Sequence, residues 1–176
     1  MKKLRSFLIL FFLFSVLLTH DAFACFGDKI GIAHLNGMNS EFSAHLIAIY
    51  VKEKTGIDSV VNEFESEEQI ESSFQKDESD IVILTYDAKP DIMKLSSDKK
   101  DSKFFTLVSG NDINIVLRVS KKRLEEMKFF TLNKVMKRVP KIISKSDFMK
   151  WLGKAEIEKM YLKEAARKYL LEEDKI

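Results

Sequence analysis

Short apolar runs alternate with helical patterns through the first half of this chain. Lys29–His34, Ile57–Phe64 and Asp80–Thr85 are each rich in β-forming residues. Helical periodicity fills the two gaps between them, over Glu41–Thr55 and Ser66–Lys76. Strands that are joined by a helix-length connection pair in parallel through a right-handed crossover. The order β-α-β-α-β therefore predicts an α/β fold on a parallel sheet.

The helix over Glu41–Thr55 has terminal signals of its own. Asn39 or Ser40 is a suitable N-cap, because a short polar side chain can accept a hydrogen bond from the first free backbone N–H groups. Gly56 stands where a C-cap glycine is expected. The helix should therefore begin near Ser40 and end at Gly56.

The middle of the chain predicts one more helix and two more strands. A helix over 87–97 begins near Pro90, and the polar stretch 96–103 is typical of an exposed linker and of a boundary. The runs 104–108 and 113–119 indicate strands, with Ser109-Gly-Asn-Asp112 as a hairpin turn. We therefore expect an N-terminal α/β lobe over 25–96, completed by two strands and C-terminal helices over 97–176.

Helical patterns continue from Ser120 to the end. We expect helices over 121–127, over 131–139 ending at Pro140, and over 146–173 with a break near Gly153. Apolar residues at helical spacing, Trp151 among them, form stripes that should pack on a core.

The first 24 residues have the layout of a cleavable secretory signal peptide. Lys2, Lys3 and Arg5 precede the apolar run Phe7–Thr19. That run is shorter than the roughly 20 residues that a membrane-spanning helix needs. Ala22-Phe23-Ala24 matches the A-x-A pattern of a cleavage site and would leave Cys25 at the new N-terminus. We therefore expect a periplasmic or otherwise exported protein.

Cys25 leaves two alternatives open. A cysteine directly after the cut is the lipidated residue of bacterial lipoproteins, and acyl chains there would hold the protein on a membrane. Ala22 and Phe23 fit that pattern imperfectly, so export without a lipid anchor is favoured. Cys25 is the sole cysteine, which excludes an intramolecular disulfide.

The composition limits the kinds of ligand and reaction that this chain can serve. Basic and acidic residues are equal in number after the first 24 residues, which gives no sign of a nucleic-acid binder. His34 and His45 are the only histidines there, and no metal-ligand spacing, glycine-rich nucleotide loop or G-x-S-x-G motif occurs. The acidic residues from Glu63 to Glu71 are interpreted as a solvated helix N-terminus. We expect no metal, no cofactor and no enzymatic activity.

Binding residues should gather where the strands end. In open α/β sheets, ligands bind beyond the C-terminal ends of the strands, and a helix N-terminus there offers free N–H groups to an anion. An ordinary turn is the equally weighted alternative for the loop after the first strand. The candidate ligand-binding residues are Asn36, Gly37, Asn39, Ser40, Glu63, Thr85, Tyr86 and Asp87.

Several stretches together resemble a known family. The segments "ACFGDKIGIAHLNG", "YVKEKTGI", "VVNEFESEEQIESSF", "SDIVILTYD" and "ARKYLLE" are similar to substrate-binding proteins of ABC transporters, nearest to the glycine betaine and choline type. The resemblance implies a periplasmic-binding-protein lobe with a reduced second part, because the segment after the third strand is short. It also implies a monomer that captures a small solute for an ABC permease.

Two further hypotheses stay open beside solute binding. An envelope interaction protein would keep the fold and contact a partner through an exposed face, without a small-molecule ligand. An exported enzyme that uses the carboxylates around Glu63 has the least support.

Overall fold

The computed structural model describes residues 29–126 and 129–176. The signal-peptide interpretation and Cys25 lie outside the described residues, and so does Met127, the last residue of a predicted helix. Five strands form one mixed sheet in the order β2-β1-β3-β5-β4. Their bounds are β1 Ile30–Leu35, β2 Ser59–Phe64, β3 Ile81–Tyr86, β4 Ser102–Ser109 and β5 Asn114–Ser120.

The first three strands are parallel, as the alternating pattern predicts. β1 lies between β2 and β3 and pairs in parallel with both, with Ile32 opposite Val61 and Ile81. β5 runs antiparallel to β3 and forms a hairpin with β4. The α/β class is thus confirmed, and strands from both sides of residue 97 share one sheet.

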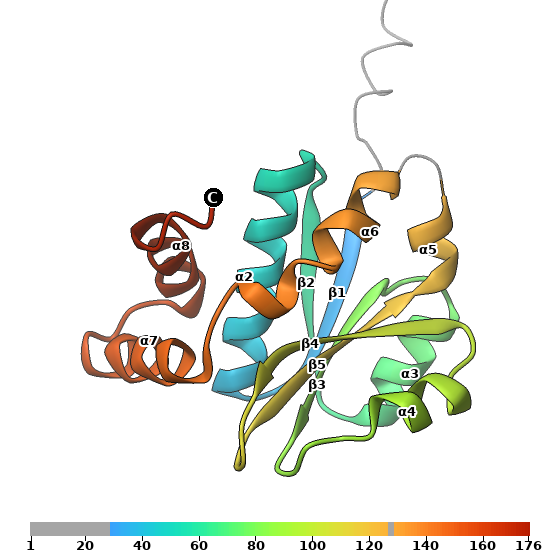
Figure 1. Ribbon diagram of the computed structural model, residues 1–176, viewed down its shortest axis with the longest axis horizontal. Helices are drawn as coiled ribbons and strands as arrows, with labels where there is room; N and C mark the ends of the chain where they lie inside the picture. The colour runs from blue at the N-terminus through green and yellow to red at the C-terminus, as the bar shows by residue number, and fades with distance from the viewer. Residues whose placement is uncertain (1–28, 127–128) are drawn as a thin grey trace, which may run out of the picture.

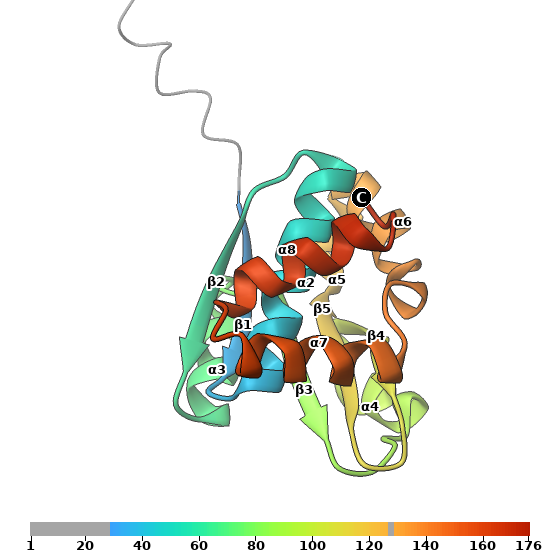
Figure 2. The same cartoon turned by 90° about the vertical axis from the view of Figure 1, so that its left-hand side faces the viewer.

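Helices cover both sides of the sheet. In Figures 1 and 2, α2, α6, α7 and α8 lie on one side, while α3 and α4 lie on the other. The described helices are α2 (Met38–Thr55), α3 (Glu67–Gln75), α4 (Ile92–Asp98), α5 (Lys121–Glu125), α6 (Phe130–Met136), η3 (a 3-10 helix, Val139–Lys141), α7 (Lys145–Ile157) and α8 (Leu162–Glu172).

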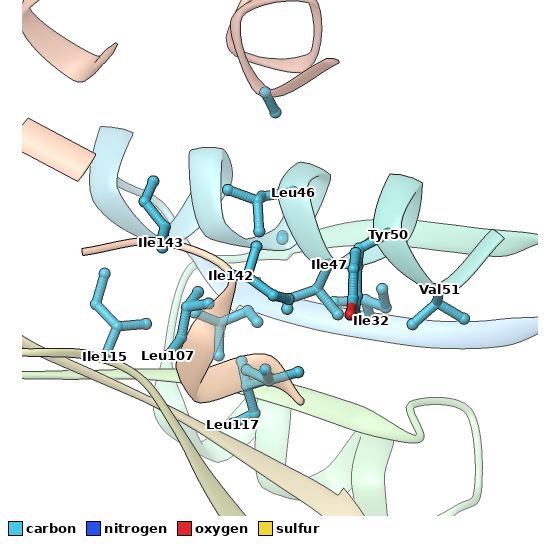
Figure 3. Close-up of a cluster of buried hydrophobic side chains, with 14 of the residues drawn as sticks. Ile32, Leu46, Ile47, Tyr50, Val51, Leu107, Ile115, Leu117, Ile142 and Ile143 are labelled. Atoms are coloured by element: carbon cyan, nitrogen blue, oxygen red, sulfur yellow. The ribbon is translucent and has the colours of Figure 1, made fainter. Parts of the chain in front are cut away.

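The sheet side under α2 holds the main hydrophobic core, and we call it the core face. Leu46, Ile47 and Val51 of α2 pack toward Ile32 of β1 and Leu117 of β5 (Figure 3). Helices α7 and α8 add Phe148, Trp151 and Tyr169 to the same cluster. Trp151 is 2% exposed and stacks edge-on against Tyr169, which confirms its predicted core position.

The opposite side, under α3 and α4, holds a much smaller cluster, and we call it the cavity face. Ala33 and Val82 of the sheet pack there against Ile70 and Phe74 of α3. Helix α4 buries none of its residues. Side chains alternate along each strand, so odd residues of β1 and even residues of β3 and β5 point to this face.

The stretch 96–103 is exposed over residues 96–101, as its polarity predicts, but it is not a linker between two parts of the fold. Ser96 to Asp98 belong to α4, whose N-cap is Asp91, and Ser102 is buried at the start of β4. Charged residues occur here because α4 lies on the surface, and Ser102 is buried because β4 pairs with β5.

The predicted break at Gly153 is wrong, since α7 continues through it to Ile157. The helix ends where Lys159 adopts a positive φ of 52° and the Met160 N–H donates to the Ala155 carbonyl. That is a Schellman arrangement, and Met160 packs against the core beyond it. Glycine inside a helix costs only about 1 kcal/mol, which packing of Trp151 and Leu152 readily offsets.

Within residues 29–126 and 129–176, no helix combines the length and the apolar character that a membrane span requires.

Candidate functional site

A sharp turn joins the end of β1 to the start of α2. Gly37 is the N-cap residue, with a φ of 146° that side-chain-bearing residues rarely adopt. The predicted caps Asn39 and Ser40 are therefore wrong, because α2 already begins at Met38. The Ser40 hydroxyl instead lies 2.6 Å from the Leu35 carbonyl oxygen and 2.8 Å from that of Gly37, and its one O–H can donate to either, which holds the turn closed.

No side chain caps this end of α2. The first N–H groups of a helix have no partner within the helix and carry partial positive charge. The first turn of α2 can therefore receive an anionic group.

A cavity of about 550 Å³ lies beside this turn on the cavity face. The ends of β1 and β3 form its floor, and α3 and α4 border it. Its lining residues are Leu35, Asn36, Gly37, Met38, Asn39, Ser40, Glu67, Ile70, Glu71, Val82, Ile83, Leu84, Thr85, Tyr86, Leu95, Lys99, Phe104 and Arg118.

The cavity brings together most of the residues that sequence nominates as a site. Those that line it are Asn36, Gly37, Asn39, Ser40, Thr85 and Tyr86. Glu63 does not, because it pairs with His34 and so points to the core-face side, one residue out of phase with Phe64. Asp87 lies beyond the end of β3, exposed and outside the lining.

Arg118 lines the cavity but is not among the ligand-binding residues predicted from the sequence. It lies in the middle of β5 with its side chain 5% exposed, and its guanidinium stacks 4.0 Å above the ring of Phe74. Its Nη1 donates to Glu71 Oε2 at 2.6 Å, and its Nε donates to Ser102 Oγ at 2.8 Å. A buried arginine must have charged or hydrogen-bonding partners. The presence of an arginine in an otherwise apolar strand is therefore the sequence signal that could have predicted a buried ion pair here.

Glu71 links three elements around this arginine. Besides Arg118 it binds Lys99 Nζ at 3.3 Å, which ties α3 to the end of α4. The hydrogen bond from Arg118 lowers the pKa of the Glu71 carboxyl, burial opposes that shift, and Lys99 adds to it. The interpretation of Glu71 as part of a solvated acidic helix end is therefore wrong, because Glu71 is an ion-paired cavity residue.

Tyr86 contributes a neutral hydroxyl. Burial raises the pKa of Tyr86, the charge of Glu67 raises it further, and Arg118 acts in the opposite direction. The phenol therefore remains protonated at neutral pH and can donate a hydrogen bond to a ligand.

Both histidines of the described chain lie away from the cavity lining. His34 is buried, with Nδ1 2.9 Å from the Leu35 carbonyl oxygen. Burial lowers the pKa of His45, and the charges of Lys163 and His34 lower it further. Among the described residues, no group of three or more His, Cys, Asp or Glu side chains could hold a metal ion. The cavity thus offers apolar surface, hydroxyls and paired charges, an arrangement suited to holding a small molecule.

Comparison with protein-family models and with curated proteins finds no match for this chain.

Proposed function

We propose that this protein is an exported, non-enzymatic solute-binding protein that holds a small zwitterionic or anionic solute and passes it to an ABC permease. The observation that carries the proposal is the cavity at the C-terminal ends of the parallel strands β1 and β3. Ligands of open α/β sheets bind at such ends. The volume of about 550 Å³ suits a small molecule, since ligand pockets measure roughly 300–1,000 Å³.

Charged ends of the solute would have complementary partners in the lining of the cavity. The uncapped first turn of α2, at Met38 and Asn39, would receive a carboxylate or phosphonate. Glu67 would face a cationic group, since Glu71 is already paired with Arg118 and Lys99. Glu67 is used here instead of the predicted ligand-binding residues Glu63 and Asp87, which lie outside the lining.

The body of the solute would rest on apolar surface. Leu84, Tyr86 and Phe104 line the sheet side, and Ile70 and Leu95 line the helical side. A few polar groups around an apolar interior fix the orientation of a ligand, while the apolar contact supplies affinity.

Export and delivery to a permease are supported by the N-terminal sequence and by the family resemblance.

A thermal-shift screen of the purified protein tests the proposal. The panel contains betaine, choline, carnitine, amino acids, phosphonates and oxyanions. A solute at about 100 times its Kd should stabilise the fold by roughly 2.7 kcal/mol, which raises Tm by several degrees. A flat response from a cooperatively melting protein would favour an envelope interaction protein.

Two tyrosine variants, one inside the cavity and one outside it, test whether the solute binds in this cavity. Tyr86→Ala should abolish the shift without unfolding the protein, since Tyr86 lines the cavity. Tyr161→Ala is the matched control, because Tyr161 is 85% exposed and lies outside that lining. An unchanged shift in Tyr86→Ala would exclude this cavity as the binding site.

A further inference from the structure

The segment from 127 to 146 carries basic residues and no acidic residue. Four of its cations, Lys134, Lys137, Arg138 and Lys141, are exposed in and around α6 and η3. The apolar residues between them are buried on the core face, and these are Leu132, Val135, Met136 and Val139. The segment is therefore amphipathic, and the charged residues on its outer side are all basic.

An exposed aromatic side chain begins this outer side. Phe130 is 63% exposed, and Lys134 Nζ lies 4.5 Å from the centre of its ring. Phe130 and Lys134 are one turn apart in α6, so they share one side of that helix, and Lys137, Arg138 and Lys141 are exposed in the turn and 3-10 helix that follow it. We call Phe130, Lys134, Lys137, Arg138 and Lys141 the basic stripe.

The charges of the basic stripe are not neutralised by the described parts of the protein. Within residues 29–126 and 129–176, none of its four cations has a carboxylate oxygen within 4.0 Å. The next basic residue, Lys145, differs, because it forms an ion pair with Asp112. The stripe thus offers its positive charge to an external partner.

The position of α6 relates the stripe to the N-terminal segment. Both views show α6 at the end of the molecule where β1 begins (Figures 1 and 2). From Cys25 to Ile30 an extended chain spans at most about 18 Å. A lipid anchor on Cys25 would therefore bring this end of the fold to the bilayer.

We propose that the basic stripe docks this protein on an anionic phospholipid surface. Lysine and arginine near such a surface are attracted to its acidic headgroups, and an aromatic ring beside them inserts at the headgroup boundary. The short reach from Cys25 to this end of the fold favours a lipid surface over an acidic protein as the partner. The proposal does not depend on a solute in the cavity.

Vesicle flotation of the full protein, as isolated from cells, tests the proposal. One set of vesicles contains phosphatidylcholine alone, and the other contains about one third phosphatidylglycerol. The stripe variant replaces Lys134, Lys137, Arg138 and Lys141 with Glu, and a milder variant replaces the same four with Gln. The matched control replaces four exposed lysines elsewhere with Glu, namely Lys76, Lys89, Lys94 and Lys150.

Each cation near an anionic surface strengthens binding roughly fivefold, so the stripe variant should bind anionic vesicles more than about a hundredfold more weakly. Binding is titrated against vesicle concentration. Because all variants share the same N-terminal segment, a difference in affinity between them measures the contribution of the stripe. The scattered control should keep most of its binding, and Phe130→Ala should lose severalfold.

Unchanged Tm values establish that the variants fold. If the Glu variant proves unstable, the Gln variant takes its place in the test, and it should also bind anionic vesicles more weakly than wild type. Equal loss in the stripe variant and the scattered control would overturn the proposal, because net charge alone would then explain the binding. Equal flotation of wild type and the stripe variant would overturn it as well, and would leave the stripe to an acidic protein partner or to solvent.

Discussion

The core face and the cavity face of the sheet differ in how completely helices cover them. On the core face, Phe42 and Phe148 are fully buried and contact each other edge-on, with ring centres 5.3 Å apart. On the cavity face the described cluster is small, and α4 buries none of its residues. One face therefore supplies most of the stability, and the other keeps space beside the strand ends.

Polar groups follow the same division. Arg118 points to the cavity face, where Glu71 and Ser102 satisfy it. On the core face, the hydroxyl of Tyr169 is satisfied by the Ile142 carbonyl at 2.6 Å, within a tightly packed interior. The charged Arg118 and Glu71 therefore lie on the face of the sheet that helices cover only partly, which is also the face that a ligand can reach.

Truncating a phenylalanine on each face should give the largest difference. Phe148→Ala removes a fully buried ring and should destabilise the fold by about 3–5 kcal/mol. Phe104→Ala, at the half-buried cavity lining, should cost clearly less, because water already reaches that space. Urea unfolding measures both. Equal losses would mean that the two faces are equally packed.

Removing Arg118 should have the next largest effect. Arg118→Met leaves Glu71 without its main partner, and because a third of the Glu71 side chain is exposed to water, we expect a loss of about 2 kcal/mol. A double-mutant cycle with Glu71→Gln should show a clear coupling energy in urea unfolding. Strictly additive losses would show that this ion pair does not stabilise the cavity face.

Lowering the pH should produce the smallest of the three changes in the free energy of unfolding. The folded-state pKa of Glu71 is lowered, so its contribution is present above the usual glutamate pKa of 4.5 and is lost as pH falls through the lower folded value. Wild type should therefore be more stable than Glu71→Gln at neutral pH, and the difference should shrink below about pH 4.5. A difference that stays constant from neutral to acidic pH would contradict the ionised pair.

The sequence predicts the local elements well and the contacts between them poorly. The alternating runs predict β1, β2 and β3 with their parallel pairing, and Gly56 ends α2 with a φ of 76° as expected. The strands and the helix end depend on neighbouring residues, and the parallel pairing follows from the helix-length connections between the strands. The Arg118–Glu71 pair joins residues 47 positions apart, so no local pattern contains it.

The candidate site shows the same limit. Loop residues at strand ends, such as Asn36 and Tyr86, are predictable because the topology brings strand ends together. Glu63 fails because the register of β2 directs its side chain to the other side, and Lys99 is missed because the fold, not the sequence pattern, brings the end of α4 to α3.

The most direct test of the cavity as a solute site is isothermal titration of wild type and Leu84→Trp with the solute that gives the largest thermal shift. Leu84 lines the cavity on β3, and a tryptophan there would fill the space. We predict that wild type binds one solute per chain, while Leu84→Trp melts cooperatively and shows no binding heat. Equal affinity in the two proteins would contradict the assignment of the solute site to this cavity.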